Sequence, residues 1–184
     1  MSLSAEALWR PATHADLAGI VAIAAEVHPD FPERSAVLDE KRLLFSQGCF
    51  CFDNNGAVLG YALSHPWTLY DIPPLDRFLE AIPADADCLY LHDVALLDAA
   101  RGGGAARALI RKLDGVARQA RLPALALTSV NGTRPLWEAL GFAPVSDKRL
   151  NVDSYGGSAV YMIKRLLPVE GENPSSAVRS SQQE

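Results

Sequence analysis

The chain has 184 residues, of which 49% are apolar, so we expect one folded domain with a sizeable core. Its formal net charge of -5 argues against a nucleic-acid-binding protein, which would need a concentrated basic surface. No apolar run reaches the ~18 residues that a membrane span needs, so we expect no membrane partner.

The three cysteines, Cys49, Cys51 and Cys88, lack the paired spacings of a zinc site or a disulfide framework. We therefore expect free thiols in a reducing compartment and no bound metal. The first ten residues hold no apolar stretch behind a basic start, so we expect no signal peptide. Together these features predict a cytoplasmic protein.

The first half of the chain predicts a short strand (6–12), two helices and a hairpin. Apolar residues at helical spacing follow Asp16 over 17–27 and recur over 33–46. Asn54-Asn55-Gly56 lies between two β-rich runs and is a strong signal for a two-residue hairpin turn.

Pro66 should end the second run of this hairpin. Prolines are frequent over residues 66–86, where 75–82 could form a short helix. We expect this segment to be an ordered insertion that covers one face of the sheet.

The second half predicts a central strand (88–97), a glycine-rich turn and a long helix. A continuous apolar run then indicates a buried strand at 123–130, and a short helix should end at Gly141. Two further strands are expected at 142–146 and 158–167. The resulting α/β (α+β) fold is a mixed, largely antiparallel central sheet of about six to seven strands with helices on both faces.

We expect one domain over residues 1–167. From Pro168 onward, Ser, Gln and Glu residues offer too little apolar surface to bury, so residues 168–184 are predicted to form a disordered tail.

The turn between the central strand and the long helix carries the clearest functional signal. Three consecutive glycines, Gly102, Gly103 and Gly104, let backbone N–H groups turn inward without obstruction by Cβ atoms. The helix that follows adds unpaired N–H donors and a partial positive charge at its N-terminus. The turn therefore predicts a phosphate-binding cradle, although a flexible strand–helix connection is the alternative.

Two well-known phosphate motifs match this turn poorly. A P-loop needs Gly-Lys-Ser/Thr, but Gly104 is followed by Ala105 and Ala106. A dinucleotide-binding fold needs a third glycine where this chain has Arg107, and it places the motif in the first strand–helix unit.

The sequence resembles the GNAT superfamily of N-acetyltransferases. The pyrophosphate signature of that family is Arg/Gln-x-x-Gly-x-Gly/Ala, and every specified position is matched by Arg101-Gly102-Gly103-Gly104-Ala105-Ala106. A second hallmark, an aromatic residue followed by Gly-Phe, corresponds to Trp137 with Gly141 and Phe142. The resemblance runs over about residues 6–167.

The resemblance implies that acetyl-CoA is the co-substrate and that an amine is the acceptor. Pantetheine would lie in a splay between the central strand and the next one, along Val94, Ala95 and Leu96, with the Val94 amide donating to the thioester carbonyl. The pyrophosphate would bind to Arg101, Gly102, Gly103, Gly104, Ala105 and Ala106. Asn131 resembles the asparagine that some members use on the pantetheine arm, and a turn residue before Gly132 is the alternative.

His92 is the candidate base, because an alkylammonium must lose a proton before it can attack. On a regular strand His92 shares a face with Tyr90, Val94 and Leu96, whereas Asp93 points to the opposite face. The segment from Tyr90 to Leu96 is similar to the arylalkylamine acetyltransferases, in which a strand histidine at this position serves a proton relay. The alternative is a structural histidine.

The chain departs from the family at Trp137, where many members have a tyrosine that protonates the departing thiolate. The indole cannot serve as that acid, so we expect Trp137 to pack beside the cofactor. Tyr155 could supply the hydroxyl from another loop, or it could simply pack its ring in a turn.

The sequence does not identify the acceptor amine of the predicted N-acetyltransferase, and small molecules and peptides are both candidates. A second hypothesis is a non-catalytic acyl-CoA-binding module, and a third is a nucleotide-binding protein. The predicted partners are acetyl-CoA and an amine, and no nucleic-acid partner is expected. A homodimer is also compatible with the sequence.

Overall fold

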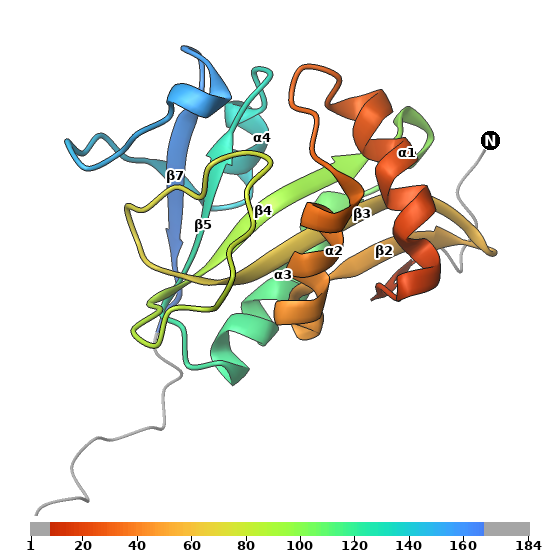
Figure 1. The fold of residues 1–184 in the computed structure, drawn as a ribbon, viewed down its shortest axis with the longest axis horizontal. Helices are drawn as coiled ribbons and strands as arrows, with labels where there is room; N and C mark the ends of the chain where they lie inside the picture. Colours follow the sequence, from red (N-terminus) through yellow and green to blue (C-terminus); the bar gives the residue numbers. More distant parts are fainter. Residues whose placement is uncertain (1–7, 168–184) are drawn as a thin grey trace, which may run out of the picture.

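Seven strands form one sheet, in the order β1-β2-β3-β4-β5-β7-β6, in the computed structural model, which describes residues 8–167 (Figure 1). All neighbours in this sheet are antiparallel except β4 and β5, which are parallel. The predicted tail and the first residues of the predicted opening strand lie outside the described residues. The strands are β1 (Leu8–Pro11), β2 (Phe50–Asn54), β3 (Ala57–Trp67), β4 (Cys88–Leu96), β5 (Ala124–Ser129), β6 (Ala143–Pro144) and β7 (Val160–Arg165).

Helices cover both faces of this sheet, as predicted. Along β3, Tyr61 and Leu63 pack with residues of α1 and α2, whereas Ala62, between them, packs with residues of α3 and α4. Because neighbouring strand residues point to opposite faces, the two helix pairs lie on opposite sides of the sheet. The helices are α1 (Leu17–Val27), α2 (Ser35–Leu44), α3 (Ala105–Gln119) and α4 (Arg134–Ala139).

The predicted hairpin is present, but its second strand is longer than expected. Asn55 and Gly56 have φ values of 56° and 85°, which are the positive values that a tight two-residue turn requires. The prediction that Pro66 ends this strand is wrong, because β3 runs through Pro66, which pairs with Leu89 of β4. The fixed φ of proline is compatible with an extended strand.

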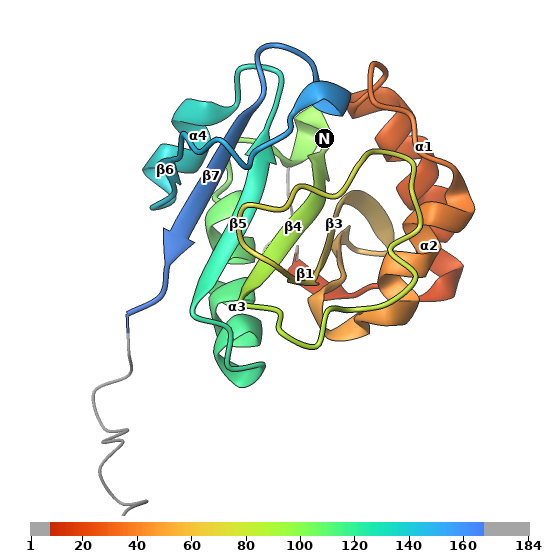
Figure 2. The same cartoon turned by 60° about the vertical axis from the view of Figure 1, so that its left-hand side comes forward.

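Residues 68–87 form the predicted insertion over the sheet, on the side of α1 and α2 (Figure 2). The predicted short helix at 75–82 is not formed. Positive φ values at Asp76 and Glu80 interrupt a helix there. The Asp76 amide donates to the carboxylate of Glu33 (3.0 Å), and the Glu80 amide donates to that of Glu40 (2.8 Å). These side chains, which lie outside the loop, thus accept hydrogen bonds that backbone carbonyl groups would accept in a helix.

The strand that carries His92 is not regular. Leu91 of β4 pairs with Ser64 of β3, and Asp93 pairs with Leu63, which leaves His92 without a partner in the register. His92 is therefore the extra residue of a β-bulge.

The bulge changes which side chains share a face. Asp93 contacts Tyr61 and His28, on the side of α1 and α2, and His92 also faces that side, beside Tyr90. Val94 and Leu96 instead pack against the cluster on the α3 side. The expectation that Asp93 points away from His92, and that His92 shares its face with Val94 and Leu96, is therefore wrong.

The parallel strands β4 and β5 pair over only part of their length. Leu89, Tyr90 and Leu91 pair with Leu125, Ala126 and Leu127, and beyond these residues the strands diverge (Figure 1). The remainder of β5 pairs with β7 alone, so the facing edges of β4 and β5 are open. This is the splay that the sequence led us to expect.

Candidate functional site

A cavity of about 460 Å³ lies where β4 and β5 diverge. The segment between α1 and α2 closes one end, and the start of α4 and the turn at Asp153–Tyr155 contribute further walls. The lining residues are Val27, His28, Phe31, Glu33, Leu75, Leu91, His92, Asp93, Val94, Leu96, Arg101, Ala106, Leu127, Thr128, Val130, Asn131, Thr133, Leu136, Trp137 and Tyr155.

Most of the residues predicted for the site meet at this cavity. The predicted residues that line it are His92, Val94, Leu96, Arg101, Ala106, Asn131, Trp137 and Tyr155. The predicted residues that do not line it are Ala95, Gly102, Gly103, Gly104 and Ala105. The side chain of Ala95 is buried toward α1 and α2, and the three glycines form an exposed turn next to the cavity rather than its wall.

Backbone conformation, and not a lack of space for a side chain, favours glycine in this turn. Gly102 and Gly104 have φ values of 79° and 81°, which glycine adopts without strain. A Cβ atom built on either residue would meet nothing within 4 Å, so space is open over both. Helix α3 begins at Ala105, directly after the turn, and its first amides have no acceptor within the helix.

Arg101 holds the start of this turn against the end of β4. Its Nε donates to the carbonyl oxygen of Leu96 (3.0 Å), and its guanidinium lies 2.7 Å from the carboxylate of Asp98. The side chain remains 55% exposed, so it is available to an anion at the turn.

His92 is paired with an acid that the sequence analysis missed. Its Nε2 lies 3.3 Å from both carboxylate oxygens of Glu33, in the segment between α1 and α2. The imidazole also packs beside His65 and Tyr90 and has no exposed surface. No motif surrounds Glu33, which the sequence placed at the start of the predicted helix over 33–46 and which the structure places just before α2.

Glu33 is held as a carboxylate despite its burial. Burial raises the pKa of Glu33, but hydrogen bonding to His92 and the charges of His92 and Lys41 outweigh it, so the pKa is lowered. The Lys41 ammonium, itself fully buried, lies 3.9 Å from the Glu33 carboxylate and donates to the carbonyl oxygen of Arg77. Glu33 is thus a fixed negative charge in the cavity wall.

A second histidine–carboxylate pair, also missed, lies beside the first. His28 Nε2 is 3.2 Å from Asp93 Oδ1 and 3.3 Å from the carbonyl oxygen of Val94. The hydroxyl of Tyr61 donates to the other oxygen of Asp93. Burial lowers the pKa of His28, but the Asp93 carboxylate and the Val94 carbonyl outweigh it and raise the pKa.

Tyr155 lies in the cavity wall with its hydroxyl already engaged. That hydroxyl donates to the carbonyl oxygen of Pro73 (2.9 Å) in the insertion. Burial raises the pKa of Tyr155, which favours the neutral phenol. Tyr155 therefore ties the turn at Asp153–Tyr155 to the insertion while it lines the cavity.

Trp137 and Asn131 both line the cavity, the first from α4 and the second from the turn after β5. Trp137 is buried against Phe142, and its Nε1 donates to Thr133 Oγ1 (3.2 Å). Asn131 has a positive φ of 52°, as a turn residue before Gly132 would, and it also lines the cavity. Its two expected roles are thus compatible.

Cys49, Cys51 and Cys88 are buried free thiols. Within residues 8–167, no group of three or more His, Cys, Asp or Glu side chains is placed to hold a metal ion. None of the helices in the same range is long and apolar enough to cross a membrane.

Solved structures with the same fold carry more than one activity. GphF, a GNAT-like decarboxylase in complex with isobutyryl-CoA, matches with a TM-score of 0.68 and 16% identity, over 85% of this chain and 98% of its own. The NatC complex bound to Gag peptide and CoA matches with a TM-score of 0.65 and 15% identity, over 88% and 99%. N-acetylglutamate synthase from Neisseria gonorrhoeae, complexed with coenzyme A and N-acetyl-glutamate, matches with a TM-score of 0.65 and 19% identity, over 90% and 36%.

Identities this low show the shared fold alone, and no curated protein matches the chain. The sequence model of the Acetyltransferase (GNAT) family, however, matches residues 17–142, which include the His92 bulge, the glycine turn and Trp137. The chain therefore belongs to the acetyltransferase (GNAT) family.

Proposed function

We propose that the protein is an N-acetyltransferase that transfers the acetyl group of acetyl-CoA to a primary amine by direct attack in a ternary complex. The observation that carries this proposal is the splay of β4 and β5, which opens a cavity that reaches the glycine turn before α3. An acyl-CoA needs both parts, a slot with unpaired strand edges for its arm and N–H donors for its pyrophosphate.

The residues present suit such a ligand. The amides of Gly102, Gly103, Gly104, Ala105 and Ala106, with the Arg101 side chain, would hold the pyrophosphate. The Val94 amide would donate to the thioester carbonyl, and Asn131 and Trp137 would flank the arm. The complexes of GphF with isobutyryl-CoA and of N-acetylglutamate synthase with coenzyme A support a CoA ligand on this fold.

In the proposed reaction, the acceptor ammonium first loses a proton. Its nitrogen then forms a bond to the thioester carbonyl carbon, the carbon–sulfur bond breaks, and the thiolate of CoA leaves. The nitrogen loses its second proton, which balances the proton that the thiolate takes up, and the amide is formed. Because the ring of His92 has no exposed surface, we propose that Glu33, which lines the cavity and contacts the ring, acts with His92 as one unit that takes up the proton.

Tyr155 is the proposed proton donor to the departing thiolate, because its hydroxyl lies in the cavity wall and Trp137 cannot ionise usefully. Its hydroxyl already donates to Pro73, and burial raises its pKa, so donation requires that bond to be exchanged. We therefore assign Tyr155 the smaller contribution. The proposed compartment is the cytoplasm, supported by the buried free cysteines, and a homodimer stays an expectation.

The deciding experiment incubates the full chain with acetyl-CoA and a panel of amines, amino acids and peptides while free thiol and acetylated product are measured. Amine-dependent release of one thiol per acetylated amine supports the proposal. Tight CoA binding without turnover would instead indicate a non-catalytic module. Binding of ATP but not of CoA would indicate a nucleotide-binding protein.

Carbon dioxide release from a carboxylated acyl-CoA without any amine is measured in parallel. A decarboxylase shares this fold, and such release in place of acyl transfer would overturn the proposal.

A further inference from the structure

The bulge at His92 brings Asp93 into the cavity. In a regular strand Asp93 would face away from His92, but here both residues lie on the side of α1 and α2 and line the cavity. The Asp93 side chain is 15% exposed, whereas the His92 side chain has no exposed surface. An acceptor that enters the cavity can therefore touch Asp93 directly.

The Asp93 carboxylate is fixed in place without being saturated. Tyr61 donates to one of its oxygens and His28 lies 3.2 Å from the other. Two carboxylate oxygens offer about four acceptor positions, so two neighbours leave capacity for a further donor. Asp93 is also the residue before Val94, whose amide would face the thioester carbonyl.

This part of the cavity stabilises positive charge. The pKa of His28 is raised although burial lowers it, because Asp93 and the Val94 carbonyl favour the imidazolium. An ammonium ion placed beside Asp93 would meet the same carboxylate, whose charge the imidazolium of His28 offsets in part. Glu33, held as a carboxylate, adds a second negative charge to the same wall.

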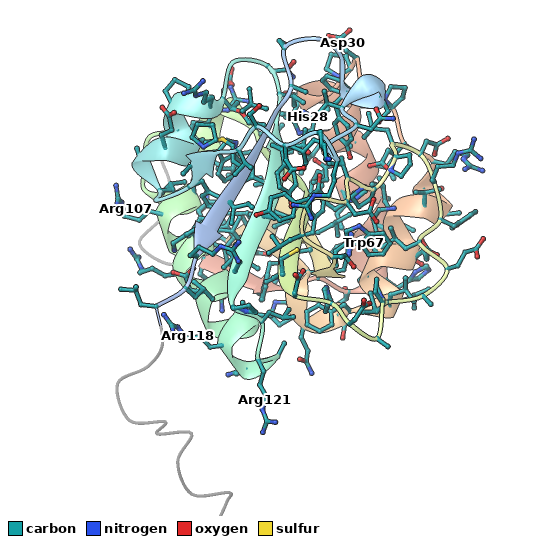
Figure 3. The ribbon with its side chains drawn as sticks, turned by 90° about the vertical axis from the view of Figure 1, so that its left-hand side faces the viewer. His28, Asp30, Trp67, Arg107, Arg118 and Arg121 are labelled. Carbon is teal, nitrogen blue, oxygen red and sulfur yellow. The ribbon has the colours of Figure 1, made fainter. Side chains whose placement is uncertain are left out.

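Among residues 8–167, no cation at this end of the cavity is free to pair with a carboxylate on the acceptor. The Nε2 of His28 is paired with Asp93 and its Nδ1 is buried, and Lys41, next to Glu33, is fully buried. Of the residues that line the cavity, Arg101 belongs to the glycine turn. The arginines of α3, such as Arg107 and Arg118, project from the other side of the sheet, away from His28 (Figure 3).

We propose that Asp93 binds the ammonium group of the acceptor and thereby selects primary amines whose neighbouring carbon bears no carboxylate. Val27, Phe31 and Leu75 line the same part of the cavity, so an apolar stem on the amine would be buried there. This inference rests on the proposed acyl transfer and narrows its substrate class.

The first test uses the unaltered protein and three acceptors that share one side chain: 3-methylbutylamine, leucinamide and leucine. The kcat/KM for 3-methylbutylamine should exceed that for leucine by at least about tenfold, with leucinamide closer to the amine. Equal or better use of leucine would overturn the inference and leave acyl transfer intact. This comparison needs no variant.

The second test uses Asp93→Asn, which keeps the size of the side chain and removes its charge. We expect KM for 3-methylbutylamine to rise by about tenfold or more and the preference over leucine to shrink, while the Kd for acetyl-CoA is unchanged. Asp85→Asn, an exposed acid of the insertion, is the matched control and should change neither quantity. An unchanged KM in folded Asp93→Asn would overturn the inference.

Calorimetric titration of 3-methylbutylamine into the CoA-loaded protein separates this inference from the proposed function. Binding that Asp93→Asn weakens supports the ammonium site even when no acetylation occurs, in which case acyl transfer alone fails. Acetylation without a preference for the amine overturns the ammonium site alone. Absence of both turnover and binding for every acceptor overturns both.

Discussion

The two ends of the cavity are built in different ways. The end proposed to bind the cofactor, called the cofactor end, consists of consecutive residues, Arg101 to Ala106, whose exposed glycines present backbone groups at the start of α3. The end proposed to bind the amine, called the acceptor end, consists of side chains from distant segments, with His28 and Glu33 between α1 and α2, Tyr61 on β3, and His92 and Asp93 in the bulge of β4.

This difference shows which kind of binding site can be recognised from a sequence motif. A backbone cradle requires glycines at fixed offsets, so its chemistry leaves a pattern in the sequence. A cluster of ionisable side chains requires only that distant residues meet, and the fold can bring them from any segment. The cofactor end should therefore respond to charge placed on the turn, and the acceptor end to the loss of single side-chain partners.

The largest effect is expected from breaking the Glu33–His92 pair. His92→Gln should lower kcat/KM by about 10²-fold while acetyl-CoA affinity is kept, because general-base help would be lost at the acceptor end alone. Glu33→Gln should lower it in the same direction, and the double variant should cost little more than His92→Gln, because the two residues act as a unit. Steady-state kinetics over a range of pH gives both quantities.

The acidic limb of the pH profile should also flatten or move in His92→Gln. His14→Gln and Glu26→Gln change exposed residues of the same types and should leave the kinetics unaltered. A loss of only a few-fold with an unchanged pH profile in folded His92→Gln would make His92 a packing residue.

The next effect concerns the cofactor end. Gly104→Glu should weaken acetyl-CoA binding by at least tenfold, about 1.4 kcal/mol, relative to Gly104→Gln, as measured by calorimetric titration. Both variants carry the same strain from the positive φ at this position, so their difference reports the charge placed beside the pyrophosphate. Equal affinities of the two folded variants would remove the turn from the cofactor site.

A smaller effect is expected at Tyr155, which also lines the cavity. Tyr155→Phe should lower kcat by only a few-fold, because CoA is a tolerable leaving group and the hydroxyl is engaged by Pro73. The melting temperature should fall modestly, since the carbonyl of Pro73 loses its donor. A loss of kcat approaching that of His92→Gln would make Tyr155 an essential acid.

The smallest effect is expected on the pKa of His28 rather than on a reaction rate. In the NMR spectrum, His28, assigned with His28→Gln, should titrate with a raised pKa, and Asp93→Asn should lower that pKa because burial then acts without its counterion. The His28–Asp93 pair should accordingly stabilise the fold below the unfolded pKa of ~6.5, and this contribution is lost as pH rises through the folded value. A His28 pKa that Asp93→Asn leaves unchanged would contradict the pairing.

Local patterns in the sequence determined the glycine turn, the hairpin at Asn55 and Gly56, and the order of helices and strands. Each depends on spacing within a short segment, such as a positive φ that glycine tolerates or a helical apolar repeat, so each could be predicted without the rest of the fold.

Only the tertiary structure decided the acceptor end. The bulge at His92 arises from the pairing of β4 with β3 and reverses the face of Asp93, which strand alternation alone would have placed wrongly. The predicted helix at 75–82 is likewise lost, because Glu33 and Glu40 supply acceptors for the loop amides from outside the segment. Such contacts join residues far apart along the chain, and they exist only once the sheet has formed.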